Sequence, residues 1–423
     1  MSASKHRPGA RPMSLSPAWH SVLVDQRSSS FSAEPAAAAH CNLYDRESWD
    51  LDFRLLHLNH GSFGAVTRTV SAEQRRWSRL VEANPAGFFA RDLAEHMAVV
   101  RERVAAFVGA DASGVVLQPN VTFAVAGVLA SVPLERGDEV LVTDDTYPAV
   151  RAAAAAACER TGAVLREARL EHAEFAAESI SDAIEHHLSE RTRLVVVDHI
   201  TSATALLVDI EPLIRRCHDH GAAVLVDGAH APGLIDLGVA RYGADFYTGN
   251  FHKWCCAPRG SAFLAVAPAW RERLRTVVAG SKSDDPFPER FEWWGTSDYT
   301  AVLATPSALD LLQDADLTQL RSRNARIVHD GALVLSTALE VAAPPSSDLA
   351  MVSLVLPDWI ARRAERAESL RRMIARECRA EVMAAEVRGR LVMRLSAHAY
   401  NRVEDFETFA HGLGSAALNP RTQ

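Results

Sequence analysis

The sequence has little of what marks secreted, membrane-spanning or nucleic-acid-binding proteins. It holds 6 cysteines in 423 residues and no CxxC pair, so neither a zinc knuckle nor a dithiol redox motif is indicated. It has no run of about 18 apolar residues, which a transmembrane helix requires. Its net charge of −8 gives no general attraction for nucleic acid or anionic lipid. These absences predict a protein that binds neither nucleic acid nor membrane.

The amino-terminal segment carries positive charge but lacks the apolar core of a secretory signal peptide. Residues 1–45 are rich in Ser, Ala, Pro and Arg without a regular period, and we expect them to form a disordered tail. Cysteines scattered without pattern are typical of a reducing compartment. Together these features predict a cytoplasmic protein.

From Trp49 onward, short apolar runs alternate with longer helical segments. The runs of strand type lie at 114–118, 139–143, 194–198, 224–227, 246–249 and 262–266. The helical segments between the earlier runs include 149–161, 179–188 and 210–220. Strands of four to six residues separated by helices predict an α/β fold with a mostly parallel central sheet.

The pattern changes after residue 300. One long helix is expected over 301–339, followed by a loop at 344–347. A strand (MVSLVLP), a charged helix over 361–380 and another strand (RLVMRLS) come next. This order predicts a small α+β domain packed on the first one. We place the large domain at residues 46–310 and the small domain at residues 311–420.

The most informative stretch is VLVDGAHAPGLIDLGVARYGADFYTGNFHKW, residues 224–254. An apolar strand ends in Asp227, and a turn of small residues carrying His230 follows. A second strand delivers His252 and Lys253 to the same edge, where open α/β sheets bind their ligands. A lysine alone is most often a surface charge, and a strand-end aspartate is often a helix cap. Their combination in this order weakens both of those interpretations.

The two residue types suit one chemistry in particular. A lysine that forms a Schiff base with an aldehyde cofactor needs a partly desolvated setting, which lowers its pKa. A pyridine ring that serves as an electron sink needs its nitrogen kept protonated, and a buried carboxylate does this. Lys253 and Asp227 are therefore of the types that pyridoxal 5'-phosphate requires.

Other motifs accompany this pair. They are LNHGSFG at 58–64, NPAGFF at 84–89, PNVT at 119–122, TYPA at 146–149, DHITSATAL at 198–206, GTSD at 295–298 and RLSAHAYN at 394–401. With this ordered set, the chain resembles the class V group of fold-type I pyridoxal-phosphate enzymes over residues 56–410. The resemblance is to the isopenicillin N epimerase-like branch. It implies a fold-type I architecture, an amino-acid substrate and a homodimer with shared active sites.

The resemblance also implies roles for individual residues. Lys253 would bind the cofactor covalently and move the substrate's Cα proton, while Asp227 would hold the pyridine nitrogen. His230 would bind the phenolic oxygen, with Ser202 nearby. The residues expected at the cofactor phosphate are Val121, Thr122, Asn250, His252 and, from the neighbouring subunit, Thr296.

On the substrate side, Tyr147 would stack on the cofactor ring and Arg394 would receive the α-carboxylate, a task suited to a guanidinium group. Asn59 is assigned to the substrate site with it. Simpler roles compete for three of these residues. Thr122 would also serve as a helix cap, Tyr147 as a core aromatic residue, and Arg394 as the partner of a nearby acidic group.

Departures from the family pattern leave the reaction open. Related epimerases often carry GTRD where this chain has GTSD, and His-Glu-Tyr where it has Asp-Thr-Tyr at 145–147. The loop 342–348 has no cysteine, which argues against a cysteine desulfurase. The first hypothesis is an epimerase or racemase. The second is β-elimination by a C–S lyase, or transamination, and the remote third is a non-catalytic sensor that binds the cofactor.

Overall fold

The computed structural model describes residues 42–170, 176–364 and 366–415. Most of the predicted tail therefore lies outside the described residues. At its end, Leu43 is buried, and its carbonyl accepts a hydrogen bond from the indole N–H of Trp49 at 2.9 Å. The packed part of the chain thus includes residues just before the boundary expected at 45/46.

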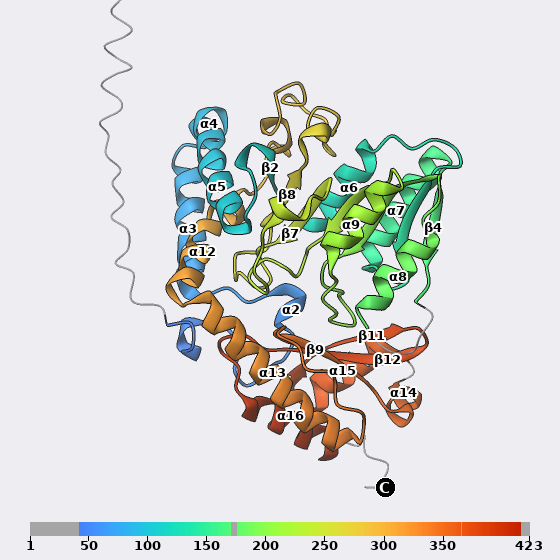
Figure 1. Ribbon diagram of the computed structural model, residues 1–423. Coiled ribbons are helices and arrows are strands. Elements are labelled where there is room, and N and C mark those ends of the chain that lie inside the picture. The colour runs from blue at the N-terminus through green and yellow to red at the C-terminus, as the bar shows by residue number, and fades with distance from the viewer. Residues whose placement is uncertain (1–41, 171–175, 365, 416–423) are drawn as a thin grey trace, which may run out of the picture. The chain divides into compact units, whose positions relative to one another are not determined.

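A seven-stranded sheet forms the centre of the larger part of the molecule (Figure 1). Neighbouring strands follow the order β2-β8-β7-β6-β5-β3-β4. Five strands, β4, β3, β5, β6 and β7, are parallel, whereas β8 runs antiparallel to both β7 and β2. The expectation of a mostly parallel sheet is confirmed. Bounds are β2 Val115–Gln118, β3 Glu139–Thr143, β4 Val164–Ala168, β5 Thr192–Asp198, β6 Ala223–Asp227, β7 Phe246–Asn250 and β8 Ala262–Val266.

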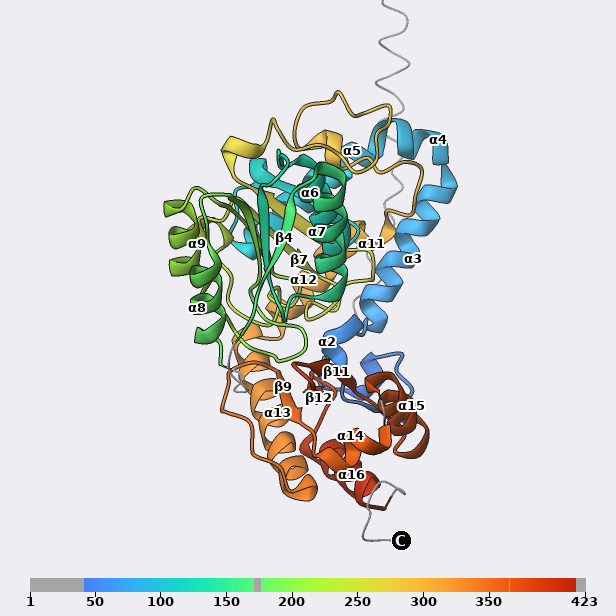
Figure 2. The same ribbon diagram turned by 90° about the vertical axis from the view of Figure 1, so that its right-hand side faces the viewer.

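Helices cover both faces of this sheet, as Figure 2 shows. On one face, α6 (Val121–Ser131) and α7 (Pro148–Thr161) pack on strand residues such as Leu225. On the other face, α8 (Glu178–His187) and α9 (Ile210–Asp219) pack on residues such as Val226, together with α5 (Leu93–Val108). Because successive strand residues point to opposite faces, continuous apolar runs are needed to fill both layers.

The segment expected to be one helix over 301–339 forms three helices: α11 (Thr300–Leu303), α12 (Thr305–Asp314) and α13 (Leu317–Leu339). Pro306 lies in the first turn of α12, where its missing N–H costs least. Asp316 has a left-handed φ of 52° and caps α13, because its side chain accepts a hydrogen bond from the Gln319 amide at 3.2 Å. The single-helix prediction was wrong because these local signals outweigh the apolar period.

The helix expected over 361–380 is likewise divided into α14 (Asp358–Ala364) and α15 (Ala367–Glu377). Arg366 has extended backbone angles at the start of α15, so the helical path is interrupted there. The strand β4 was not expected. It is an edge strand that carries Arg and Glu, which hide its alternation and protect its open edge.

The carboxy-terminal part contains an antiparallel sheet in the order β11-β12-β9, flanked by α13 and α16 (Val403–Ser415). Its strands are β9 Met351–Val355, β11 Met383–Val387 and β12 Arg390–Ser396. An early segment joins it: β1 (Leu56–His57) pairs in parallel with β10 (Ala380–Glu381), and Leu58 lies in the same core. The domain boundary at 310/311 stays a prediction, and this amino-terminal strand belongs with the later domain.

The remaining elements connect these layers. They are α2 His60–Phe63, α3 Arg68–Ala83, α4 Pro85–Gly87, α10 Val239–Tyr242, a π-helical turn at Phe88–Asp92 and 3-10 turns at Arg46–Ser48, Ala112–Gly114, Pro268–Trp270 and Glu289–Phe291. Within the described ranges, no helix is both long enough and apolar enough to cross a bilayer.

The contact between α13 and α16 gives a test of core packing. A methyl group added at Gly331 of α13 would lie 2.6 Å from Cδ1 of Phe406. Gly331→Ala should therefore destabilise the protein by about 1–3 kcal/mol through overpacking, measured by urea unfolding. Gly414→Ala in α16 is the control, since nothing lies within 4 Å of its added methyl group, and it should be neutral or slightly stabilising. Equal stability of both variants would contradict this packing.

Candidate active site

Polar residues gather where the parallel strands end. Asp227 is the last residue of β6, and Asn250 is the last residue of β7. By alternation both side chains point to the face that α6 covers, since Leu225 and Phe246 pack there. The Val121 amide at the start of α6 donates a hydrogen bond to Asn250 Oδ1 at 3.1 Å. The structure thus joins the strand ends to a helix amino terminus.

Lys253 follows β7 and reaches back over the sheet edge. Its Nζ lies 3.2 Å from Nε2 of His230, while the Trp254 indole N–H donates to Nδ1 of the same ring at 3.3 Å. With Nδ1 accepting, a neutral His230 carries its proton on Nε2 and points it at the lysine, which can accept only as a free amine. Burial lowers the pKa of Lys253 to about 8, against the opposing effect of Asp227. A pKa of about 8, lowered from the usual value for lysine, leaves a minor but appreciable share of free amine near neutral pH.

The Asp227 carboxyl is held in place by the turn that follows it. Its Oδ1 accepts a hydrogen bond from the Ala229 amide at 2.9 Å, and its side chain is 3% exposed. Burial raises the pKa of Asp227, while the Ala229 amide and the Lys253 charge act in the opposite direction. A buried carboxyl of this kind gains from a cationic partner, and the protonated nitrogen of a pyridine ring is one.

The predicted phosphate site holds a buried ring nitrogen, because Nδ1 of His252 has no hydrogen-bond partner among the described residues. In the first turn of α6, the Val121 amide already donates to Asn250 and the Phe123 amide to Asn120. The Thr122 amide is therefore the one that this helix start would offer to an anion. Asn120, and not Thr122, is the helix cap, because its side chain accepts from the Phe123 amide at 2.9 Å. Thr122 is exposed, so its hydroxyl is available, and these groups fit an anion.

Arg394 lies on β12 and is 1% exposed. Its Nη1 donates to the carbonyl of Ser202 at 2.7 Å, and its Nη2 donates to Asn59 Oδ1 at 3.1 Å and Ser62 Oγ at 3.0 Å. No carboxylate of the described residues pairs with it, and its Nε has no acceptor there. Burial lowers its pKa only to about 10, so it stays charged. An uncompensated buried guanidinium suits the carboxylate of a substrate.

Two predicted residues lie at the periphery. Tyr147 caps α7 and is 43% exposed, so it is not a core aromatic residue. Thr296 is exposed in the loop before α11, and no hydrogen bond connects it with the described residues of this site. Its assignment depends on a second subunit and stays a prediction.

The sequence reasoning gave no role to several residues that lie here. His60 Nε2 lies 2.9 Å from the Lys253 carbonyl and its Nδ1 lies 3.0 Å from the Tyr400 hydroxyl. Asp198 ends β5 in register with Asp227. His60 and Asp198 both occur in the motifs quoted above. The position of Asp198 at the end of a predicted strand was visible in the sequence.

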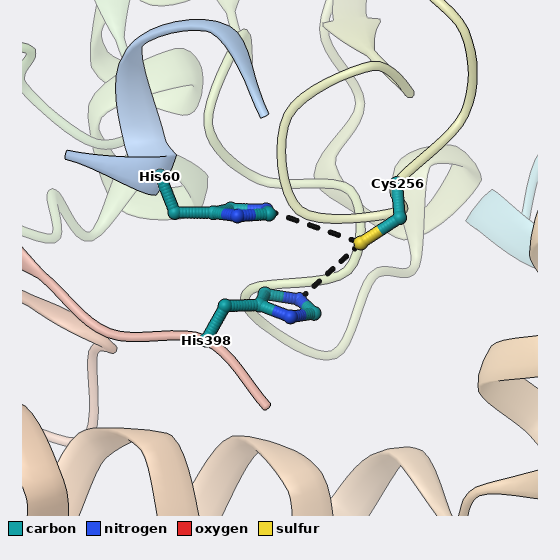
Figure 3. A group of neighbouring side chains, drawn as sticks. All are labelled: His60, Cys256 and His398. Atoms are coloured by element: carbon teal, nitrogen blue, oxygen red, sulfur yellow. Dashed lines mark hydrogen bonds between the residues drawn. The ribbon is translucent and has the colours of Figure 1, made fainter. Parts of the chain in front are cut away.

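Behind the lysine, His60, Cys256 and His398 meet in a buried cluster (Figure 3). Sγ of Cys256 lies 3.9 Å from Nε2 of His60 and 3.6 Å from Nε2 of His398. The two imidazoles are stacked, with centroids 4.0 Å apart and planes at 18°. A shared metal ion would lie out of the plane of at least one ring, which imidazole ligands disfavour. The cluster is better explained as packing that fixes the backbone of the lysine loop.

Comparisons with known proteins agree with this geometry. The family model for class-V aminotransferases matches residues 65–409. This chain belongs to that family. Isopenicillin N epimerase from Streptomyces clavuligerus is 30% identical over 383 residues, which cover 86% of this chain and 95% of the relative. The putative L-cysteine desulfhydrase 2 of Oryza sativa subsp. japonica is 32% identical over 358 residues, covering 78% and 74%.

Among solved structures, a C-DES variant with glycine covalently linked to its PLP cofactor superposes with a TM-score of 0.73. It is 21% identical, and the match covers 88% of this chain and 99% of that one. This likeness confirms the fold. As a member of this family, the enzyme depends on pyridoxal phosphate. The unpartnered His252 nitrogen, the buried Asp227 carboxyl and the Lys253 amine fit that group.

The low pKa of Lys253 can be measured directly. In protein freed of cofactor, acetylation of Lys253 followed by mass spectrometry should rise with a midpoint near pH 8, because the amine forms as pH rises. Arg394→Gln should shift the midpoint to higher pH, since the Arg394 charge lowers the pKa of Lys253. Arg390→Gln, an exposed change on the same strand, is the control. A midpoint near 10 in the unaltered protein would contradict the buried amine.

Proposed function

We propose that this enzyme removes the Cα proton of an amino-acid substrate and continues with epimerase- or racemase-type chemistry. The observation that carries the proposal is the buried Lys253 amine, with a pKa of about 8, on the sheet edge that also holds Asp227. A base whose pKa lies this close to neutral pH is far better matched to proton abstraction than an ordinary lysine. Pyridoxal phosphate, when bound, supplies the electron sink for the resulting carbanion.

The surrounding residues bind and orient. Arg394 receives the substrate α-carboxylate, helped by Asn59, and so directs the Cα hydrogen toward Lys253. Asp227 would keep the pyridine nitrogen protonated, and His230 and Ser202 would contact the phenolic oxygen. The first turn of α6, with Asn250 and His252, would hold the phosphate. Tyr147 would stack on the ring.

The epimerase assignment is supported by the relative from Streptomyces clavuligerus, of which 95% is matched at 30% identity. A second epimerase, from Amycolatopsis lactamdurans, is 30% identical over 390 residues. Epimerisation also needs a proton returned to the opposite face of Cα. We assign that step to Tyr147, whose exposure allows it to exchange protons with water.

The second candidate is β-elimination by a C–S lyase. It is favoured by the rice desulfhydrase relative at 32% identity and by the need for only one base, Lys253. Transamination shares the same first step. A cysteine desulfurase route lacks its nucleophile in the loop 342–348, and burial raises the pKa of the Cys378 thiol to about 11, which disfavours its thiolate.

The reactions separate by their products. Holoenzyme should be incubated in D2O with a panel of amino acids and cysteine conjugates. Deuterium at Cα with inverted configuration supports the epimerase, and a keto acid with ammonia and a released thiol supports the lyase. Lys253→Ala should lower Cα exchange by at least about 10²-fold, because it removes the base. Lys282→Ala is the control, and full exchange without Lys253 would exclude the proposal.

We further propose a cytoplasmic homodimer in which Thr296 contacts the cofactor phosphate of the neighbouring subunit. The exposed loop position of Thr296 supports this, because it leaves the hydroxyl available to another chain. The location is supported by Cys158 and Cys217, which are buried and form no disulfide among the described residues.

Thr296→Val should weaken pyridoxal-phosphate binding roughly tenfold or more, through the loss of one hydrogen bond to a charged group. Ser297→Ala, the exposed neighbour, should bind normally. Cofactor affinity is measured by fluorescence titration and assembly by sedimentation. An active monomer with undiminished affinity would rule out the shared site.

A further inference from the structure

A second carboxyl lies beside the one assigned to the cofactor ring. Asp198 is the last residue of β5, and it is the register partner of Asp227 on β6. In-register residues of parallel strands point to the same face, with strands about 4.8 Å apart. The face is that of α6, since Val196 and Leu194, two and four residues before Asp198, pack in its core. Both carboxyls are buried, with exposures of 6% and 3%.

Charged groups approach Asp198 from every neighbouring element. Asp227 lies on β6, Asp145 follows β3, and Lys253 follows β7. The Tyr147 amide, at the start of α7, approaches it as a donor. Behind Asp145 stand the Thr204 hydroxyl, which donates to it, and Arg388, whose Nη2 lies 3.9 Å away. Asp198 therefore faces two other carboxyls and one amine.

Two neighbouring buried carboxyls do not both ionise, so one of them holds a proton. Each carboxyl has a backbone amide donor, Tyr147 for Asp198 and Ala229 for Asp227. Asp227 has the better-stabilised anion, because Asp198 also faces the Asp145 carboxyl. Burial raises the pKa of the Asp198 carboxyl well above its usual range, and the charges of Asp227 and Asp145 raise it further. The proton of the pair belongs on Asp198.

We propose that Asp198 is a positioning residue of the cofactor site, a neutral carboxylic acid that keeps Asp227 as the single ionised carboxylate facing the ring nitrogen. The inference deepens the proposed function and rests on its assignment of Asp227. A neutral Asp198 also serves the lysine, because an ionised Asp198 would raise the pKa of Lys253 and reduce the free amine. The Asp198–Asp227 pair then carries one negative charge, which the protonated pyridine nitrogen would balance.

The protonation state of Asp198 can be observed by infrared spectroscopy. Holoenzyme and cofactor-free protein labelled with ¹³C at the aspartate carboxyl should show the carbonyl stretch of a neutral acid at pH 7. Subtracting the spectrum of Asp198→Asn should isolate that band, because asparagine has the same shape without a titrating group. Asp209→Asn, an exposed change at the start of α9, should leave the band intact. A difference spectrum that shows only an ionised carboxylate would overturn the proposal.

Coupling between the two residues gives a readout that a merely structural role would not produce. In Asp227→Asn, the pH midpoint of the Asp198 band should fall by about one unit or more, because a like charge has been removed. An unchanged midpoint would also overturn the proposal.

Activity then separates this inference from the proposed function. Asp227→Asn should lower Cα exchange by about 10²-fold or more, and Asp198→Asn should lower it less, because it keeps a neutral side chain of the same shape. A loss in folded Asp198→Asn as large as that in Asp227→Asn would overturn the neutral-acid role. Normal exchange in Asp227→Asn would instead contradict the assignment of Asp227 and leave the infrared result on Asp198 standing.

Discussion

The constraint on which this site depends is the cost of burying charge at the carboxyl edge of an apolar sheet. Strands β5 and β6 run through leucine and valine up to Asp198 and Asp227, and β7 is buried along its whole length up to Asn250. Desolvation there pushes Lys253 toward its neutral amine and the aspartates toward their neutral acids. The protein thereby prepares a base and holds its remaining negative charge where a ring cation would balance it.

The same cost explains why the carboxy-terminal part of the chain is needed for the site. Arg394 comes from β12 and is held by the Ser202 carbonyl and by Asn59 and Ser62 from the amino-terminal segment. Three distant stretches of sequence therefore meet around one guanidinium that has no carboxylate partner among the described residues. Pairing β1 with β10 brings the Asn59 segment into position. A buried cation kept without a counter-ion makes sense where a substrate supplies the anion.

Most of the fold could be predicted because its signals are local. Each predicted strand of the central sheet forms, because a short apolar run bounded by polar residues suits a sheet covered on both faces. The predictions that failed also depended on local features of the sequence. The charged residues of the edge strand β4 hid its pattern, and Pro306 and the Asp316 cap divide the helix expected over 301–339. In the site, Lys253, His230 and Arg394 were predicted through motifs, and their roles stay predictions. Asp198 was overlooked because its significance depends on register with Asp227, which only the assembled sheet shows.

The two residues to which we assign proton transfer differ in their access to water, and this bears on the proposed reaction. Nζ of Lys253 lies against His230, which Trp254 holds from its other ring nitrogen, so a proton taken by Lys253 would stay close to Cα. Tyr147 is 43% exposed, so a proton that it delivered would be replaced from water. Under this proposal, inversion at Cα would need the Tyr147 hydroxyl as the second acid and no further buried acid. The absence of another buried acid opposite Lys253 among the predicted site residues is therefore compatible with epimerase chemistry, and the leaving group at Cβ becomes the feature that separates it from elimination.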